Sequence, residues 1–401
     1  MKILQVNCVY KVGSTGKIVA DIHNGLLARG IDSVVCYGRG TVIREPGVYK
    51  TCSELYAKFN NLMSRFTGIM YGGCWVSTWR LISIIKKEKP DIVHLHCING
   101  YFVNVYRLIQ WLKDNHIKTV LTLHAEFMYT ANCGHALECE KWRTGCGSCP
   151  RRWKETKSLF LDGTAQSWMR MKKAFEGFET DCAVVSVSPW LRERAKQSPI
   201  LEKFYHVTVL NGLDTDVFRP QDGGNLPERF GLKDRKVVLH VTAAFSLDRN
   251  HFKGGWYVAE LARRMPEVTF VVIGSREKDL DLPENVLNIG RVENQDELAV
   301  WYSAADVTLL TSKKETFSMV VAESLCCGTP VVGFKAGAPE MIALPEYSAF
   351  VEFGDVDALQ EQVQKMLLRD KTDAQEAQHS YSKECMCENY YRYYEELKCG
   401  R

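Results

Sequence analysis

Apolar and polar positions along the chain follow two alternating patterns. Short apolar runs, typical of buried strands, are separated by longer stretches in which apolar residues recur at helical spacing. In the first half we expect strands at 3–7, 33–37, 92–96, 120–123 and 183–188, and helices at 17–29 and 105–115. In the second half we expect strands at 237–241, 269–273, 286–289, 307–310 and 330–334, and helices at 255–264, 296–304 and 317–327. This alternation of strand and helix predicts parallel sheets that are covered on both faces.

Two such series in succession predict an α/β protein of two doubly wound domains with a cleft between them. We place the first domain at residues 1–210 and the second at 211–380, because Gly, Asp and Pro cluster directly after residue 210. An insert at 131–150 is rich in cysteine. The segment 381–398 is charged and tyrosine-rich, and it reads as a further helix.

The composition narrows the class of protein. With 401 residues the chain has room for two domains of typical size. Its formal net charge of +3 argues against a dedicated nucleic-acid binder. No run of 18 apolar residues is present, so we expect no transmembrane helix. The apolar start of the chain is broken by Gln5 and Asn7 and reads as a strand and not as a signal peptide. We therefore expect a cytoplasmic protein in which most of the 15 cysteines are reduced and buried.

Two glutamates, Glu315 and Glu323, are the first candidates for chemistry, with seven residues between them. The helix expected directly after Glu315 offers free N–H groups and a positive dipole end to a phosphate. Because roughly two helical turns separate the glutamates, both carboxylates would lie on nearly the same face. They could then hold sugar hydroxyls on either side of a diphosphate. The alternative is a helix with one capping and one exposed glutamate.

Further candidates lie at the ends of expected strands, where open α/β sheets bind ligands. Gly13-Ser14-Thr15-Gly16 follows the first strand, and its backbone N–H groups can meet a phosphate unless it is only a tight turn. His96 ends the third strand and His124 the fourth; a strand-end histidine can also be structural, as we expect of His94. Lys253, beside two glycines, can neutralise a diphosphate, or it is a solvated loop lysine.

These residues stand within segments that resemble, in order, the retaining, nucleotide-sugar-dependent glycosyltransferases of family 4. The segments are GSTG at 13–16, PDIVHLH at 90–96, TLH at 122–124, SVSPWLRE at 186–193, LNGLDTDVFRP at 210–220, FKGG at 252–255, IG at 273–274 and the E-x7-E pair at 315–323. The resemblance extends from residue 1 to about 370. It implies the GT-B fold, in which two Rossmann-like domains face a central cleft and the C-terminal helix, here 381–401, packs back on the first domain.

The resemblance implies an enzyme that moves a sugar from a nucleotide-diphosphate sugar, a UDP- or a GDP-sugar, to a glycan or lipid-linked glycan acceptor. The cysteine-rich insert resembles a subset of the family that builds bacterial surface polysaccharides such as exopolysaccharide, capsule and O antigen. No cofactor is implied for catalysis. The alternatives are a catalytically inert nucleotide- or glycan-binding protein of the GT-B fold, or a GT-B epimerase.

The resemblance also implies roles for individual residues. The catalytic residues would be His124, Glu315 and Lys253, and Glu323 would bind the ribose hydroxyls. The remaining donor-binding residues would be Gly13, Ser14, Thr15, Gly16, Arg249, Arg291, Val292, Thr316, Phe317, Ser318 and Met319. Arg249 departs from the commonest spacing of the family. On the acceptor side we expect His96, Asn99 and Tyr101.

The insert carries four cysteines, Cys133, Cys139, Cys146 and Cys149, within 17 residues. Such a cluster, ending in C-x2-C, is typical of a structural zinc site with His135 as a spare ligand. Zinc would organise a loop that is too polar and glycine-rich to fold alone. A disulfide and free thiols are the alternatives, because the first spacing is wider than usual.

A basic segment at 151–157 surrounds Trp153. It could contact anionic lipid, and the alternative is a solvated loop. To the expected cytoplasmic location we therefore add peripheral association with the inner face of the plasma membrane.

Overall fold

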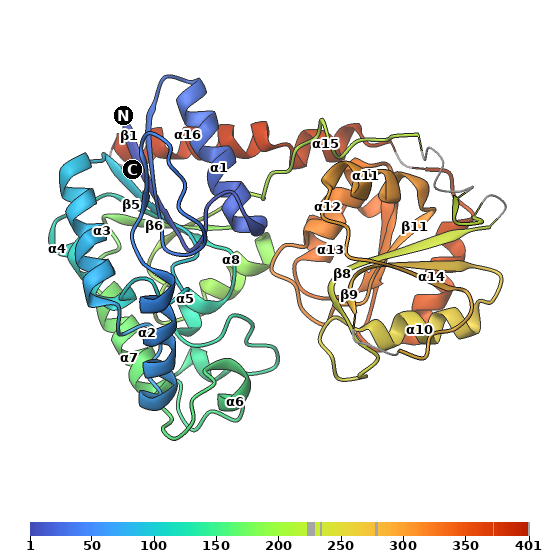
Figure 1. The fold of residues 1–401 in the computed structure, drawn as a ribbon, viewed down its shortest axis with the longest axis horizontal. Helices are drawn as coiled ribbons and strands as arrows, with labels where there is room; N and C mark the ends of the chain where they lie inside the picture. Colours follow the sequence, from blue (N-terminus) through green and yellow to red (C-terminus); the bar gives the residue numbers. More distant parts are fainter. Residues whose placement is uncertain (223–228, 233–234, 277–279, 372, 400–401) are drawn as a thin grey trace. The chain divides into compact units, whose positions relative to one another are not determined.

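The computed structural model describes residues 1–401 except 223–228, 233–234, 277–279, 372 and 400–401. The chain divides into two compact units, one comprising Met1–Leu210 with Met386–Arg401 and the other Asn211–Cys385. Each unit contains a parallel sheet with helices packed on its faces (Figure 1). Both units belong to the doubly wound α/β class that the alternating pattern predicts.

Within the described residues, the first unit has seven parallel strands in the order β3-β2-β1-β4-β5-β6-β7. The strands are β1 (Lys2–Asn7), β2 (Asp32–Tyr37), β3 (Val48–Lys50), β4 (Ile92–Leu95), β5 (Thr119–Leu123), β6 (Cys182–Ser186) and β7 (Tyr205–Thr208). The helices are α1 (Gly13–Ala28), α2 (Glu54–Thr67), α3 (Trp75–Glu88), α4 (Val105–Asp114), α5 (Phe127–Thr130), η1 (Lys141–Arg143), α6 (Arg152–Glu155), α7 (Thr164–Phe175) and α8 (Pro189–Ala195). The strand order reverses between β1 and β4, and ligands of such sheets bind outside the carboxyl ends at this switch.

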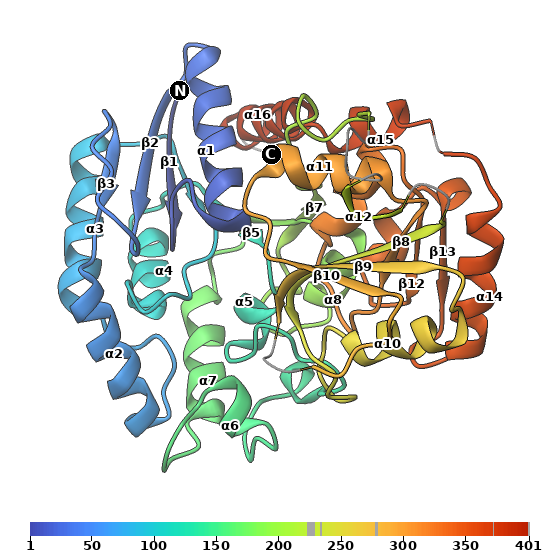
Figure 2. The same ribbon diagram turned by 45° about the vertical axis from the view of Figure 1, so that its right-hand side comes forward.

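The second unit has six parallel strands among its described residues, in the order β10-β9-β8-β11-β12-β13. The strands are β8 (Val237–Phe245), β9 (Thr269–Arg276), β10 (Val286–Gly290), β11 (Val307–Leu310), β12 (Val331–Phe334) and β13 (Ser348–Val351). The helices are α10 (Gly255–Arg264), α11 (Gln295–Ala304), α12 (Met319–Cys326), α13 (Pro339–Ile342), η2 (Pro345–Tyr347), α14 (Val356–Leu367) and α15 (Gln375–Tyr381). Helices α10 and α14 lie beside the sheet (Figure 2). Their side chains in the buried core include Val258, Leu261, Leu359 and Val363. Here the switch lies between β8 and β11.

Helix α16 (Lys383–Lys398) adds buried tyrosines to the core of the first unit. The Tyr394 hydroxyl lies 2.6 Å from His94 Nδ1, and the Tyr390 hydroxyl lies 3.0 Å from Thr122 Oγ1. The expected start of this helix at 381 is wrong by two residues. Ser382 instead pairs with Leu213 in an isolated β-bridge, which interrupts the helical backbone between α15 and α16.

Three strands, β3, β7 and β13, are absent from the sequence expectation. Each is three or four residues long and lies at an edge of its sheet. Edge strands are partly solvated, so their side chains carry little of the apolar run that marks a buried strand.

Candidate functional site

Polar side chains gather at the carboxyl ends of β4 and β5 in the first unit. His96 follows β4 and His124 follows β5, and their rings are stacked with His96 Nδ1 3.1 Å from His124 Nε2. His96 is buried, whereas His124 is half-buried. The structure therefore brings together two of the residues that the sequence proposes for the sugar side of the reaction.

His94 has a different environment, deeper in the sheet. Its Nδ1 and Nε2 both have partners, the Tyr394 hydroxyl at 2.6 Å and Thr122 Oγ1 at 2.7 Å. Burial and the nearby His124 hold the pKa of His94 well below its ordinary value. A neutral histidine with both ring nitrogens bonded inside the core is consistent with the structural role that we expect of it.

Gln5 on β1 determines which nitrogens of the histidine pair carry protons. Its amide nitrogen donates to the Val19 carbonyl at 3.3 Å, so its amide oxygen is the atom that lies 3.1 Å from His96 Nε2. His96 Nε2 must then carry the proton, and His96 Nδ1 accepts one from His124 Nε2. Burial lowers the pKa of His124 to about 4, so its ring is neutral near pH 7 and Nδ1 is its acceptor nitrogen. An acceptor of this kind suits a sugar hydroxyl.

The Gly13-Ser14-Thr15-Gly16 segment forms the first turn of α1 and does not precede it. The expected helix start at 17 is therefore wrong, because the helical backbone already begins at Gly13. The preceding Val12 provides no side-chain cap, so the helix start is open to an anion. Gly16 is buried against the strand-end loop, where an added Cβ would lie 3.2 Å from the Val9 side chain. Asn7 braces this loop by donating to the Val9 carbonyl at 2.7 Å.

The acceptor-side candidates of the first unit fall into two places. Tyr101 lines a pocket of about 190 Å³ together with Tyr71 and Arg170. Its ring lies 4.7 Å from that of Tyr71, and burial raises the pKa of its hydroxyl. Asn99 is half-buried in the loop between β4 and Tyr101, while His96 belongs to the histidine pair.

An ion pair marks the corresponding strand ends of the second unit. Lys253 Nζ lies 2.6 Å from Glu315 Oε1, and the two side chains are 21% and 16% exposed. Lys253 precedes α10 and Glu315 follows β11, so the pair stands at the switch between β8 and β11. The Thr311 hydroxyl donates to the Lys253 carbonyl at 2.9 Å, and Gly254, with φ of +69°, approaches Thr311 too closely to admit a Cβ. Two residues proposed as catalytic are thus held in contact.

The backbone around Glu315 differs from the expected one. Glu315 pairs with Gly337 in an isolated β-bridge, and α12 begins only at Met319. The expected helix start at 317 is wrong, and the two glutamates do not share one helix. Ser318, and not Glu315, directly precedes the first residue of α12. Its φ is +84°, and its buried hydroxyl has no hydrogen-bond partner among the described residues. Such a strained residue is typical of a ligand-binding turn.

The rest of the Glu315–Glu323 segment is largely covered. Thr316 and Phe317 are buried and Met319 is half-buried. The groups of this turn that a ligand could contact are therefore mainly backbone groups. Glu323 lies on α12 and accepts a hydrogen bond of 2.9 Å from the Tyr302 hydroxyl of α11. Burial and the neighbouring carboxylate raise the pKa of Tyr302 well above its usual value, so the tyrosine stays a donor that orients Glu323.

The remaining donor candidates of the second unit lie in less enclosed surroundings; they are Arg249, Arg291 and Val292. Arg291 and Val292 line an open pocket of about 710 Å³ after β10, and Arg291 pairs with Glu293 at 3.4 Å. The Arg249 guanidinium lies over the Trp256 ring, 4.7 Å from its centroid. Arg249 is thus engaged with α10, apart from the Lys253–Glu315 contact.

The four cysteines of the insert surround one small cavity of about 20 Å³, which Trp142 also lines. All four are free thiols. Burial raises the pKa of Cys146 to about 11 and also raises those of Cys133 and Cys149. Nowhere in the described part of the chain do three His, Cys, Asp or Glu side chains converge closely enough to hold a metal ion.

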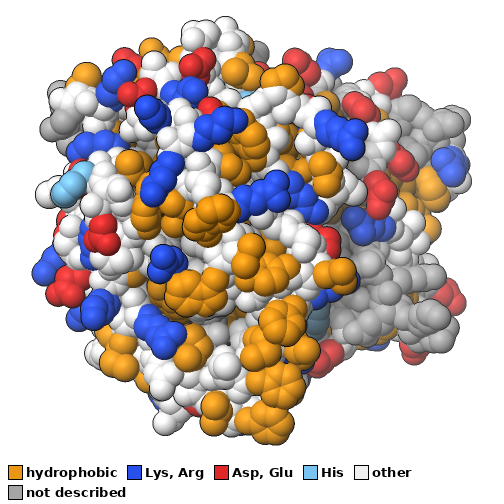
Figure 3. Space-filling model, turned by 60° about the vertical axis from the view of Figure 1, so that its left-hand side comes forward, with side chains coloured by type: hydrophobic (Ala, Val, Ile, Leu, Met, Phe, Trp, Pro, Cys, Tyr) orange, Lys and Arg blue, Asp and Glu red, His pale blue; other side chains and the backbone are white. Residues whose placement is uncertain are grey.

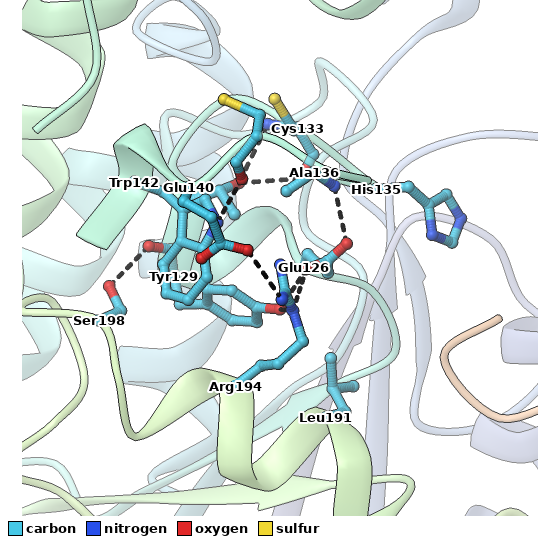
Figure 4. A network of polar contacts seen from close by, with 12 residues as sticks. Glu126, Tyr129, Cys133, His135, Ala136, Glu140, Trp142, Leu191, Arg194 and Ser198 are labelled. Atoms are coloured by element: carbon cyan, nitrogen blue, oxygen red, sulfur yellow. Dashed lines mark hydrogen bonds and ion pairs between the residues drawn. The ribbon is translucent and has the colours of Figure 1, made fainter. Parts of the chain in front are cut away.

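A buried ion pair, missed by sequence reasoning, anchors this insert (Figure 4). Glu126, two residues after His124, is completely buried and accepts from Arg194 Nε at 2.8 Å, the Tyr129 hydroxyl at 2.6 Å and the Ala136 backbone at 2.7 Å. The Arg194 guanidinium also lies over the Trp142 ring. The available signal is a single acid within the apolar stretch after TLH and an arginine directly after SVSPWLRE.

Comparison with solved structures identifies the fold. Sucrose-phosphate synthase from Thermosynechococcus elongatus shares the fold with a TM-score of 0.70 at 15% identity, covering 100% of both chains. HepE from Anabaena in complex with UDP gives a TM-score of 0.64 at 16% identity, covering 99% of this chain and 100% of that one. The fold is GT-B, as the resemblance implies, with two Rossmann-like domains.

Family models then identify the chain. Residues 15–217, just over half of the chain, match the model described as Glycosyltransferase Family 4, and residues 255–369 match Glycosyl transferases group 1. The chain belongs to glycosyltransferase family 4 and is a transferase enzyme.

Two relatives align with this chain over different fractions of their own length. N-acetyl-alpha-D-glucosaminyl L-malate synthase from Bacillus anthracis is 25% identical over 90% of this chain and 86% of its own. WcaC of Escherichia coli K12, which its name assigns to colanic acid biosynthesis, is 28% identical over 37% of this chain and 40% of its own. The chain therefore aligns with less than half of WcaC.

Proposed function

We propose that the enzyme transfers a sugar, with retention of configuration, from a UDP- or GDP-sugar to a glycan or lipid-linked glycan acceptor. The observation that carries the proposal is the Lys253–Glu315 contact at the β8–β11 switch. A lysine paired with a carboxylate that is 16% exposed can exchange that partner for a diphosphate. The released carboxylate can then accept hydrogen bonds from sugar hydroxyls.

The donor contacts follow from this exchange. Lys253 and the backbone N–H groups of residues 316–319 would stabilise the leaving diphosphate, and Ser318 would offer its buried hydroxyl. Glu323, oriented by Tyr302, would accept from the ribose hydroxyls. Arg291 and Val292 would contact the base in their open pocket. Arg249 remains the weaker donor candidate, because it is stacked on Trp256.

In the first unit, His124 would accept a hydrogen bond from a donor-sugar hydroxyl. The open first turn of α1, Gly13-Ser14-Thr15-Gly16, would bind a phosphate oxygen. His96, Asn99 and Tyr101 would contact the acceptor. The leaving phosphate itself would take the proton of the attacking acceptor hydroxyl, so the new glycosidic bond forms on the face that the diphosphate leaves.

The name of one similar protein favours surface-polysaccharide synthesis as the setting. WcaC is assigned to colanic acid biosynthesis, and the HepE structure holds UDP. An inert sugar-nucleotide binder or an epimerase would keep the donor contacts without transferring the sugar to an acceptor.

The test is a panel of UDP-, GDP-, ADP- and CMP-sugars with released nucleotide as the readout. We expect release from one donor, loss of that release in Lys253→Ala and Glu315→Ala, and an α-anomeric product from an α-linked donor by NMR. The matched controls are Lys365→Ala and Glu361→Ala, which break an ion pair of the same unit that is 61% and 60% exposed. Donor binding without release in the presence of a cell-envelope glycan extract would instead support the inert binder.

Zinc in the insert is a separate part of the proposal. Four thiols around one cavity supply the ligand type, but the loop would have to draw them together, because no three described side chains converge. Metal content of the purified protein, compared between Cys146→Ser and the buried control Cys326→Ser, tests it. A zinc content near zero in the unmodified protein would leave four free thiols.

A further inference from the structure

Helix α2 presents its apolar side to solvent. The side chains of Leu55, Phe59, Leu62, Met63 and Phe66 recur at helical spacing and are 43–80% exposed. The residues that α2 buries are instead small or polar, namely Ala57, Asn60 and Ser64. A surface helix normally has the reverse orientation.

The orientation of α2 is fixed by polar contacts and is not a loose packing. Asn60 Oδ1 accepts a hydrogen bond of 2.7 Å from the Cys74 backbone, and Asn60 Nδ2 donates to the Tyr56 carbonyl at 2.8 Å. The Tyr56 hydroxyl accepts from the Val76 backbone at 3.3 Å. The bonds from the Cys74 and Val76 backbone join α2 to the start of α3 and keep the large apolar side chains outward.

Helix α3 extends the same surface. Trp75, Val76 and Trp79 are 57%, 67% and 70% exposed. On the other side of α2, Phe160 stacks on Phe66 with 5.9 Å between the ring centroids. We name the outward side chains of α2 and α3, with Phe160, the apolar face; Figure 3 shows apolar side chains gathered on this side of the molecule with basic side chains beside them.

The charges around the apolar face are predominantly basic. Residues 54–88 contain five Lys or Arg and two acids, Glu54 and Glu88, which pair with Arg39 and Lys2. The adjoining segment 151–173, joined to α2 by the bond from the Leu159 backbone to the Arg65 carbonyl, contains seven Lys or Arg and two acids. Of those acids, Glu155 pairs with Arg151 and Asp162 is bonded to Thr164. The whole chain has a net charge of only +3, so these two segments hold an excess that the rest of the chain opposes.

We infer that the apolar face docks on a membrane surface that contains anionic lipid. Exposed Trp and Phe side chains flanked by Lys and Arg are the composition of helices that lie in the lipid interface. A second copy of this chain would oppose two strongly basic surfaces. In the described residues no helix is long and apolar enough to span a membrane, so the contact is peripheral.

The surface is broader than the basic segment 151–157 that the sequence indicates. Trp153 is 61% exposed, with the Arg152 guanidinium 4.7 Å from the centre of its ring, and it adds to the basic side. The pocket that Tyr101 lines also contains Met63 and Thr67 of α2. If the acceptor is lipid-linked, a step that rests on the proposed function, docking here would bring its head group to that pocket.

The experiment is co-sedimentation of the full chain with vesicles of phosphatidylcholine alone or with phosphatidylglycerol. We expect binding to the anionic vesicles, weakened roughly tenfold or more by Phe59→Ser with Trp79→Ser, since apolar area drives such binding. Arg65→Glu with Arg80→Glu should weaken it similarly and remove its salt dependence. The control, Leu27→Ser with Leu368→Ser, changes two side chains that are 49% and 89% exposed outside this surface and should bind as the unmodified chain does.

Circular dichroism and thermal unfolding check that each variant is folded, and release of nucleotide from a water-soluble donor checks the donor site independently of lipid. Equal vesicle binding by the Phe59/Trp79 variant and the unmodified chain would overturn the inference. So would failure of the unmodified chain to bind anionic vesicles. Dimerisation in ultracentrifugation that Phe59→Ser with Trp79→Ser abolishes would also overturn it and assign the face to a second copy.

Discussion

Two ion pairs follow strand ends in this protein, and they differ in how completely the fold encloses them. Glu126 is fully buried, and its carboxylate accepts from Arg194, Tyr129 and a backbone N–H. The Lys253 and Glu315 side chains remain 21% and 16% exposed, joined by one 2.6 Å contact. In the first pair Glu126 is shielded from solvent and Arg194 is 12% exposed, whereas in the second pair both side chains can be reached by solvent.

This difference separates a structural charge from one available for chemistry. A buried carboxylate with three donors has no capacity for a ligand, and losing a partner leaves an uncompensated charge. A partly exposed pair contributes little to stability, so its partners can be exchanged at small cost.

The largest effect is expected from the Glu126–Arg194 pair. Glu126→Ala should lower the free energy of unfolding by about 3–5 kcal/mol, because Arg194 loses its buried counter-charge and keeps a 3.4 Å contact with the more exposed Glu140. Urea denaturation, followed by the transition of the first unit, measures the loss. Glu361→Ala on α14 is the control for an exposed pair and should cost less than about 1 kcal/mol. A loss for Glu126→Ala as small as the control would mean that the network is not structural.

For the Lys253–Glu315 pair we expect the reverse: its loss should reduce activity and change stability little. Lys253→Ala should reduce the rate of sugar transfer about 10²–10³-fold, the usual cost of removing one group that stabilises developing charge. Its free energy of unfolding should change by no more than about 1 kcal/mol. Steady-state kinetics and urea denaturation of the same preparation give both numbers. Lost stability together with retained turnover would reverse the roles of the two pairs.

The contrast between the pairs also shows how much of the structure can be predicted from the sequence. Apolar periodicity predicts α10 and β11 with their observed bounds, because both are buried runs whose signal is local. It misses the start of α12, since the β-bridge from Glu315 to Gly337 and the positive φ of Ser318 depend on tertiary contacts.

For the candidate site, the rule that open α/β sheets bind ligands at the carboxyl ends of their strands places Lys253 and Glu315 near one edge of a sheet. Their direct contact depends on the turn at Gly254 against Thr311, which the sequence does not specify. The Glu126–Arg194 pair joins residues 68 positions apart, so no local pattern predicts it. The tautomers of the histidine pair likewise depend on Gln5, a residue of another strand.

A smaller effect should follow from disturbing that neutral pair. Gln5→Leu removes the acceptor for His96 Nε2 and should lower turnover about tenfold, the cost of one buried hydrogen bond with an unsatisfied donor. ¹⁵N NMR of the imidazoles should show the proton of His124 moving away from Nε2. Gln5→Glu keeps an acceptor and should retain the tautomer. An unchanged NMR signature in Gln5→Leu would exclude Gln5 as the residue that positions the pair.

The smallest effect, on the dependence of stability on pH, distinguishes the neutral histidines from the charged pair. Burial lowers the pKa of His124 to about 4, whereas it is about 6.5 in the unfolded chain. Between these values the unfolded chain binds a proton that the folded protein does not, so stability rises with pH. The contribution of His124 is fully present above pH 6.5 and is lost as the pH falls toward 4, by about 1.4 kcal/mol per pH unit. His124→Asn should therefore flatten the fall in unfolding free energy between pH 7 and 5, with the exposed His379→Asn as control. Parallel pH profiles for His124→Asn and the unmodified chain would mean that His124 is protonated as readily as a solvated histidine, and the tautomer assigned through Gln5 would then be wrong.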